Sequence, residues 1–223
     1  GGAIHVPGGG THHGMADRAN GFCYLNDPVL ALHALRRNGL RRLAYVDLDA
    51  HHPDGVEPAF ADDPEMRMIS IHEENRWPFT GAITDTAGGS AFNMPVPRGL
   101  NDTEFRAILD KLILPRLAEF KPEAIVLQAG ADALLEDPLS RLSLSNRAYV
   151  AALRAIRPLS PRLQCRHPSR PPEFGVNTGF APLAVKRIDC LSVPKSRDLK
   201  DPGDDLVSVL PDKFYGVFDG ATD

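Results

Sequence analysis

The order of apolar and polar positions along the chain predicts an α/β protein with a parallel sheet. Three runs are mainly apolar and have the length of buried strands, namely Leu43–Leu48, Met66–His72 and Glu123–Ala129. A further short strand is expected at Asn93–Pro97. Helical patterns separate these runs, and strands that alternate with helices are typical of parallel sheets.

Start and stop signals place the helices. A helix is expected from Asn26 to about Arg37, because an Asx residue ahead of proline starts helices well. Another follows 101–104, which has the spacing of a capping box, and its expected apolar face consists of Phe105, Ile108, Leu109 and Leu112. Shorter helices are expected at 56–61 and 147–156. The six glycines among residues 1–20 predict a loop there.

Polar side chains collect where the expected strands end. Asp49 and His51 follow the first strand, and Asp132 follows the last. Since parallel strands place their carboxyl ends at one edge, we expect these three side chains to share that edge. Carboxylate oxygen together with imidazole nitrogen suits zinc or another divalent first-row metal, and three protein ligands leave a coordination position open.

Composition argues against several classes of partner. The net charge of −4 and the pI near 6.1 give no electrostatic reason for direct nucleic-acid binding. No apolar run approaches the ~20 residues of a membrane span, so no membrane partner is expected. Three cysteines without a CxxC pair indicate a reduced, cytoplasmic compartment.

Histidine and proline are unevenly distributed. Seven of the eight histidines lie in the first 72 residues, whereas proline is concentrated after residue 157. These shifts predict a site-bearing domain at 1–160 and a divergent, poorly ordered tail at 161–223.

Several ordered motifs in residues 1–160 resemble the zinc-dependent histone deacetylase and acetoin-utilisation-type deacetylase superfamily. They are the tandem His12-His13, GFCYLND at 21–27, VDLDAHHPDGVE at 46–57 and QAGADAL at 128–134. HEENRWPFTG at 72–81 is closer to the bacterial members. The resemblance implies a three-layer α/β/α fold of the arginase/deacetylase type, incomplete here at both ends. It also implies hydrolysis of an acetyl amide on an acetylated protein, peptide or small amine.

The resemblance assigns roles to the residues at the sheet edge. It implies that zinc is bound by Asp49, His51 and Asp132. The general acid–base pair would be His12 and His13, with Asp47 and Asp54 as the carboxylates that orient them and raise their basicity.

Further residues match positions with structural or substrate-contacting roles in that superfamily. Asp47 and Ser70 resemble part of a structural potassium site. The channel for the acylated side chain would be lined by Phe22, Trp77 and Leu139.

The chain departs from the superfamily in one important respect. The family has a glycine-rich GGGGY motif whose tyrosine donates to the oxyanion, but this chain reads SPRLQCRHPSRPPEFGVNTGF at 160–180. Neither Tyr149 nor Tyr215 has the right context. Since the loss of one oxyanion donor typically costs ~10²–10³ in turnover, we expect impaired activity. The sequence after residue 160 is consistent with a frameshift, a fusion or a gene-model error.

The sequence leaves two alternatives open. The chain could be a catalytically inactive metal-binding fragment of the same superfamily. It could also be an arginase-like hydrolase with two metals, which would carry an aspartate two positions after the metal-binding histidine. Pro53 occupies that position here, which favours one metal.

Overall fold

The computed structural model describes residues 4–160 and 215–217. The chain divides into one unit of residues 1–163 and 212–223 and another of residues 164–211. All described residues belong to the first unit. The tail expected at 161–223 therefore lies outside the described residues, apart from its short strand at 215–217.

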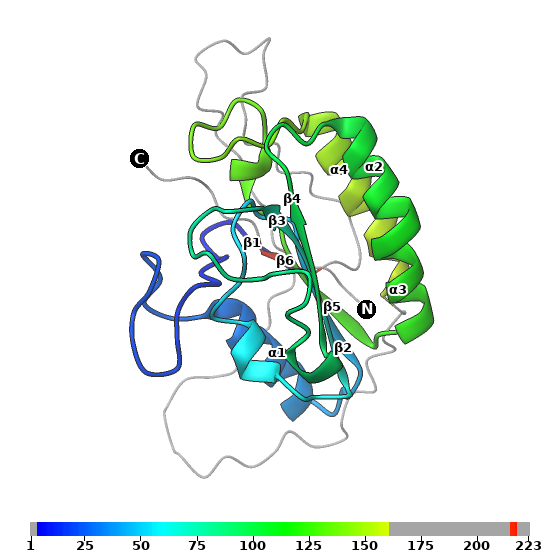
Figure 1. Ribbon diagram of the computed structural model, residues 1–223. Helices are drawn as coiled ribbons and strands as arrows, with labels where there is room; N and C mark the ends of the chain where they lie inside the picture. The colour runs from blue at the N-terminus through cyan, green and yellow to red at the C-terminus, as the bar shows by residue number, and fades with distance from the viewer. Residues whose placement is uncertain (1–3, 161–214, 218–223) are drawn as a thin grey trace. The chain divides into compact units, whose positions relative to one another are not determined.

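Six parallel strands form a single sheet in the order β1-β6-β5-β2-β3-β4 (Figure 1). Their bounds are β1 Ile4–Val6, β2 Leu43–Asp47, β3 Met66–Glu73, β4 Ala91–Val96, β5 Ala124–Gln128 and β6 Tyr215–Val217. The expectation of a loop throughout residues 1–20 is wrong at β1. That strand is only three residues long and pairs with β6 from the far end of the chain, so no local sequence pattern predicts it.

The helices begin and end close to the predicted positions. They are α1 Asp27–Arg37, α2 Asp102–Ile108, α3 Leu114–Phe120 and α4 Asn146–Ile156. Asn26 caps α1, and Asn101 with Glu104 forms the predicted capping box of α2. Helix α1 covers one face of the sheet, and α2, α3 and α4 cover the other (Figure 1).

Alternation along the strands divides the apolar side chains between two cores. In β2, Leu43 and Tyr45 pack with Leu32 of α1, whereas Ala44 and Val46 belong to the larger core that includes residues of α2, α3 and α4. Strands buried on both faces explain why β2 and β5 read as continuous apolar runs rather than as alternating ones.

The long helical segment after residue 101 corrects one prediction. Leu109–Ile113 is a single π turn between α2 and α3, and Pro115 stands in the first turn of α3. Because a π turn holds one more residue than an α turn, the buried face moves on by one position. Ile113 is fully buried, while Leu112, which was expected on the apolar face, is 36% exposed.

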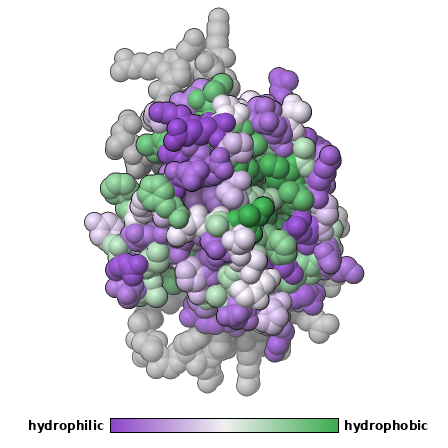
Figure 2. Space-filling view, in the orientation of Figure 1, coloured by the Kyte–Doolittle hydropathy of each residue, from purple (hydrophilic) through white to green (hydrophobic). Residues whose placement is uncertain are grey.

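Several large apolar side chains are exposed on loops, and they include Phe22, Trp77, Phe79 and Leu139. Figure 2 shows apolar side chains among polar ones at the left of the view, where loops of residues 7–26 and 74–86 lie in Figure 1. In the part of the chain that the structure describes, no helix has the length and apolarity needed to cross a membrane.

Candidate metal centre

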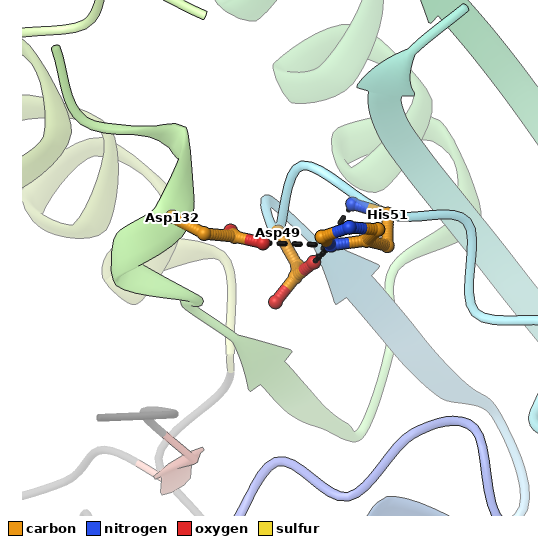
Figure 3. A group of neighbouring side chains, drawn as sticks. All are labelled: Asp49, His51 and Asp132. Atoms are coloured by element: carbon orange, nitrogen blue, oxygen red, sulfur yellow. Dashed lines mark hydrogen bonds and ion pairs between the residues drawn. The ribbon is translucent and has the colours of Figure 1, made fainter. Parts of the chain in front are cut away.

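Strands β2 and β5 bring the three predicted metal ligands together at the carboxyl edge of the sheet. The two strands are paired in parallel, with Asp47 opposite Gln128 at their ends. Asp49, His51 and Asp132 each offer one ligand atom, and these atoms all lie within 4.8 Å of one another (Figure 3). His51 Nδ1 is 2.7 Å from Asp132 Oδ2 and 3.1 Å from Asp49 Oδ1.

Backbone hydrogen bonds fix the two carboxylates on the loops that carry them. The backbone N–H of Ala50 donates to Asp132 Oδ1 at 2.9 Å, which ties the loop after β2 to the turn after β5. Gly130 matters because a Cβ there would lie 2.0 Å from Asp49 Oδ2. The sequence did not single out Gly130, since only the close approach of the two loops reveals the requirement.

The charges at this site fit a divalent cation. Burial and the neighbouring charge of Asp49 raise the pKa of Asp132 to about 7. Burial alone would lower the pKa of His51, but hydrogen bonds to Asp132 and Asp49 raise it to about 10. Two buried carboxylates that meet at one imidazole nitrogen therefore favour positive charge among them. Oxygen and nitrogen donors of this kind suit zinc.

The tandem histidines lie beside the three candidate ligands. His12 Nδ1 is 2.7 Å from Asp47 Oδ2, and His13 Nδ1 is 2.6 Å from Asp54 Oδ1. The two rings are 4.1 Å apart, and His12 Nε2 is 3.8 Å from Asp49 Oδ1. Because a carboxylate only accepts, each Nδ1 carries a proton, so Nε2 can accept one only while its ring is neutral.

The N-terminal end of α1 holds the loop that carries these histidines. The Asp27 carboxylate accepts hydrogen bonds from the backbone N–H groups of Gly10 and Thr11. The Asn26 side chain donates to the carbonyls of His12 and Gly14, at 3.0 and 2.9 Å. The polar end of the GFCYLND motif thus anchors the turn that brings both histidines to one site.

The pKa values of the two histidines shift in opposite directions. Burial opposes protonation of His12, but the charges of Asp47 and Asp49 outweigh it and raise its pKa to about 9. Burial, with the neighbouring His12, lowers the pKa of His13 despite its hydrogen bond to Asp54.

Two residues that the sequence did not single out complete the hydrogen bonding of the orienting carboxylates. The Tyr45 hydroxyl donates to Asp47 Oδ2 at 2.5 Å, and the Asn20 side chain donates to Asp54 Oδ2 at 3.0 Å. In the sequence, Tyr45 is one apolar residue of an expected buried strand, and Asn20 lies in a glycine-rich loop. Neither position carries a local signal of its role.

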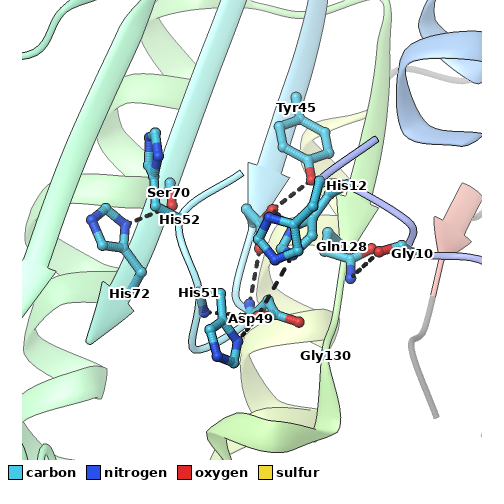
Figure 4. Close-up of polar contacts among 12 residues, drawn as sticks. Gly10, His12, Tyr45, Asp49, His51, His52, Ser70, His72, Gln128 and Gly130 are labelled. Carbon is cyan, nitrogen blue, oxygen red and sulfur yellow. Dashed lines mark hydrogen bonds and ion pairs between the residues drawn. The ribbon is translucent and has the colours of Figure 1, made fainter. Parts of the chain in front are cut away.

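Asp47 and Ser70, which were predicted to hold potassium, are paired across β2 and β3. Ser70 Oγ lies 2.8 Å from His72 Nδ1 (Figure 4). Both oxygens of Asp47 already accept hydrogen bonds from protein groups. The structure thus makes the two side chains neighbours, and the bound potassium stays a prediction.

Of the three expected channel residues, Trp77 lies directly against the site. Its ring is 4.6 Å from that of His13 and 6.3 Å from that of His51. A Cβ on Gly21 would come within 2.4 Å of the Trp77 ring, so the glycine before Phe22 lets the ring approach. The side chains of Phe22 and Leu139 are exposed.

A buried network joins His52 and His72 to the end of the loop that carries Trp77. His52 Nδ1 is 2.8 Å from Thr80 Oγ1, and its Nε2 is 2.9 Å from Glu57 Oε2. His72 Nε2 donates to the Gly81 carbonyl at 3.0 Å. Burial and the adjacent His52 lower the pKa of His72 to about 4.

Tyr149 does not supply an oxyanion donor. Its side chain is buried under the loops of the site, and its hydroxyl lies 2.9 Å from the Leu48 carbonyl and 2.8 Å from the Gly130 carbonyl. A hydroxyl has one proton to donate, and both neighbours are acceptors. Tyr149 therefore braces the two loops. The side chain of Tyr215 lies outside the described residues.

The histone deacetylase domain family matches residues 2–167. Histone deacetylase HOS1 of Saccharomyces cerevisiae is 38% identical over 142 residues, which are 62% of this chain and 30% of HOS1. The acetoin utilization protein AcuC of Bacillus subtilis is 38% identical over 155 residues, which are 66% of this chain and 40% of AcuC.

A solved structure extends the likeness to the fold. The crystal structure of an HDAC homolog from Aquifex aeolicus matches with a TM-score of 0.66 and 42% identity, covering 70% of this chain and 44% of the homolog. The chain belongs to the histone deacetylase family, and its parallel sheet with flanking helices confirms the predicted arginase/deacetylase-type fold. The chain spans less than half the length of each of these three relatives.

Proposed function

We propose that this chain carries the metal centre of a zinc-dependent deacetylase that hydrolyses an acetyl amide. The observation that carries the proposal is the convergence of Asp49, His51 and Asp132 beside two histidines paired with carboxylates. The substrate class follows from the family, which acts on acetylated substrates. We propose an acetylated protein, peptide or small amine, and no direct nucleic-acid partner.

In this proposal Asp49, His51 and Asp132 hold the metal. A bound zinc ion supplies Lewis acidity toward an amide carbonyl and toward water. The neutral imidazole of His12 or His13 accepts a proton at Nε2, and an imidazolium returns a proton to the departing amine. Asp47 and Asp54 hold the two rings in the tautomer that this exchange requires.

Trp77 excludes water from one side of the proposed site, since its ring packs on His13. Phe22 and Leu139 are proposed to complete the walls of the acyl channel. We also propose that Asp47 and Ser70 contribute to a potassium site. The odd number of cysteines stays the argument for a cytoplasmic location.

Activity of this chain is proposed to be impaired because it does not contain the GGGGY motif. A catalytically inactive metal-binding fragment is the second candidate, and the buried, engaged hydroxyl of Tyr149 favours it.

Deacetylation of an acetyl-lysine peptide by the zinc-loaded chain, with and without chelator, separates the two candidates. The deacetylase proposal predicts slow turnover that chelator abolishes. A folded, zinc-loaded chain without any turnover would support the inactive fragment instead. Turnover that survives removal of the metal would contradict both.

A further inference from the structure

Glu73, at the end of β3, is a buried carboxylate that gathers donors from three parts of the chain. Its side chain has no exposed surface. Oε2 accepts from Arg76 Nε at 2.8 Å and from the backbone N–H of Arg141 at 2.7 Å. Oε1 accepts from Arg98 Nε at 3.2 Å. A charge with this many partners is stable in the folded protein only while they stay in place.

Arg76 makes a second contact through another nitrogen of its guanidinium group. While its Nε donates to Glu73, its Nη1 donates to the backbone carbonyl of Leu139. The planar guanidinium thus joins the end of β3 to the segment 137–141. The same carboxylate holds that segment again through the N–H of Arg141.

Arg76 directly precedes Trp77, and the backbone turns tightly there. The N–H of Phe79 donates to the Arg76 carbonyl at 2.8 Å, so a fixed Arg76 fixes the turn that presents Trp77. The Trp77 ring then rests on His13. Leu139 lies on the other segment that Arg76 holds.

We propose that Glu73 and Arg76 form a positioning pair that sets the placement of Trp77 relative to Leu139, and thereby the fit of the acylated chain. The inference rests on the proposed function of Trp77 and Leu139 as walls of the acyl channel. The pair touches no reacting atom and acts through the two loop segments.

Arg98 provides the matched control. It reaches the other oxygen of the same carboxylate, but from beyond the end of β4, and its side chain is 71% exposed. Arg98→Gln therefore removes one partner of Glu73 while leaving the bridge to Leu139. Arg76→Lys keeps a positive charge beside Glu73, yet an ammonium lacks the fork that also reaches the Leu139 carbonyl.

Trp77 is the sole tryptophan of the chain, so its fluorescence reports the loop directly. In the zinc-loaded chain we expect Arg76→Lys and Arg76→Met to raise the acrylamide quenching constant on the order of twofold. The amide hydrogens of 139–141 should exchange faster in both variants. Arg98→Gln should resemble the parent chain in both measurements.

Kinetics with an acetyl-lysine peptide test the effect on substrate. Arg76→Lys should raise KM several-fold with a smaller change in kcat, because Trp77 and Leu139 move while the residues proposed for catalysis stay in place. Unchanged quenching and exchange in both Arg76 variants would overturn the proposal. An equal effect of Arg98→Gln would overturn it too, since any lost charge would then suffice. The fluorescence and exchange measurements test the positioning role of Glu73 and Arg76 even if no chain turns over substrate. Absence of turnover in every chain would count against the proposed deacetylase function and not against the positioning role.

Discussion

Two adjacent histidines with the same kind of partner occupy different electrostatic environments. His12 is buried near three carboxylates, which raise its pKa, whereas His13 has Asp54 as its hydrogen-bonded partner and packs against Trp77. The difference arises from which carboxylates lie nearby rather than from the residue type. At neutral pH it favours a protonated His12 beside a neutral His13.

His13→Ala is expected to abolish measurable deacetylation while the metal content stays that of the parent chain. The substitution removes a proton acceptor, which typically contributes ~10²–10⁴ in rate, but none of the candidate ligands. Turnover and zinc content should be measured on the same preparation. Zinc loss in this variant would mean that the histidine pair has a structural role.

The low pKa of His72 predicts a pH-dependent stability. Its folded pKa of about 4 lies below the unfolded value of 6.5, so the folded state binds fewer protons between these values. This contribution is present above pH 6.5 and is lost as the pH falls toward 4. Between pH 7 and pH 5 it amounts to on the order of 2 kcal/mol.

The variant His72→Gln tests this prediction. Its free energy of unfolding in urea should fall less between pH 7 and pH 5 than that of the parent chain, because the titrating ring is gone. Equal slopes in the two chains would show that folding does not lower the pKa of His72, and that other groups cause the pH dependence of stability.

At the scale of elements, the π turn between α2 and α3 decides which side chains are buried. Pro115 has no N–H to donate within the helix, and the wider turn ahead of it moves the apolar face by one residue. The result is a paired contrast between Leu112, which is partly exposed, and Ile113, which is fully buried.

Alanine substitutions at these two neighbours should differ sharply. Ile113→Ala should lower the free energy of unfolding by about 2–5 kcal/mol, because it leaves a cavity in the core. Leu112→Ala should cost about 1 kcal/mol or less, as is usual for exposed positions. Equal losses, or a larger loss at Leu112, would place the buried face as a regular α-helix has it.

The sequence predicts some of these elements and not others. Strands β2, β3 and β5 were predictable because each is a local apolar run, and Asp49, His51 and Asp132 because each follows such a run closely. Strand β1 was not, since it gains its identity from a partner strand at the other end of the chain. The roles of Gly130 and Tyr45 also escaped prediction, because each depends on a neighbour that only the folded chain supplies.

At the scale of the whole molecule, one edge of the sheet collects nearly all the groups proposed for chemistry. The loops after β2 and β5 supply the proposed metal ligands, the loop after β1 supplies the proposed histidine pair, and the loop after β3 supplies Trp77. Parallel strand order makes this convergence possible, as in other open α/β sheets. We therefore propose that Asp49, His51 and Asp132 together bind one metal ion.

The zinc content of the purified chain, measured by mass spectrometry, tests this binding. We expect about one zinc per chain, because the donor set suits a single tetrahedral ion with an open position. His51→Gln should lose it, whereas the adjacent His52→Gln should retain it, because His52 binds Thr80 and Glu57 instead. A folded chain without zinc, or equal zinc in both variants, would show that these three residues do not form the metal site.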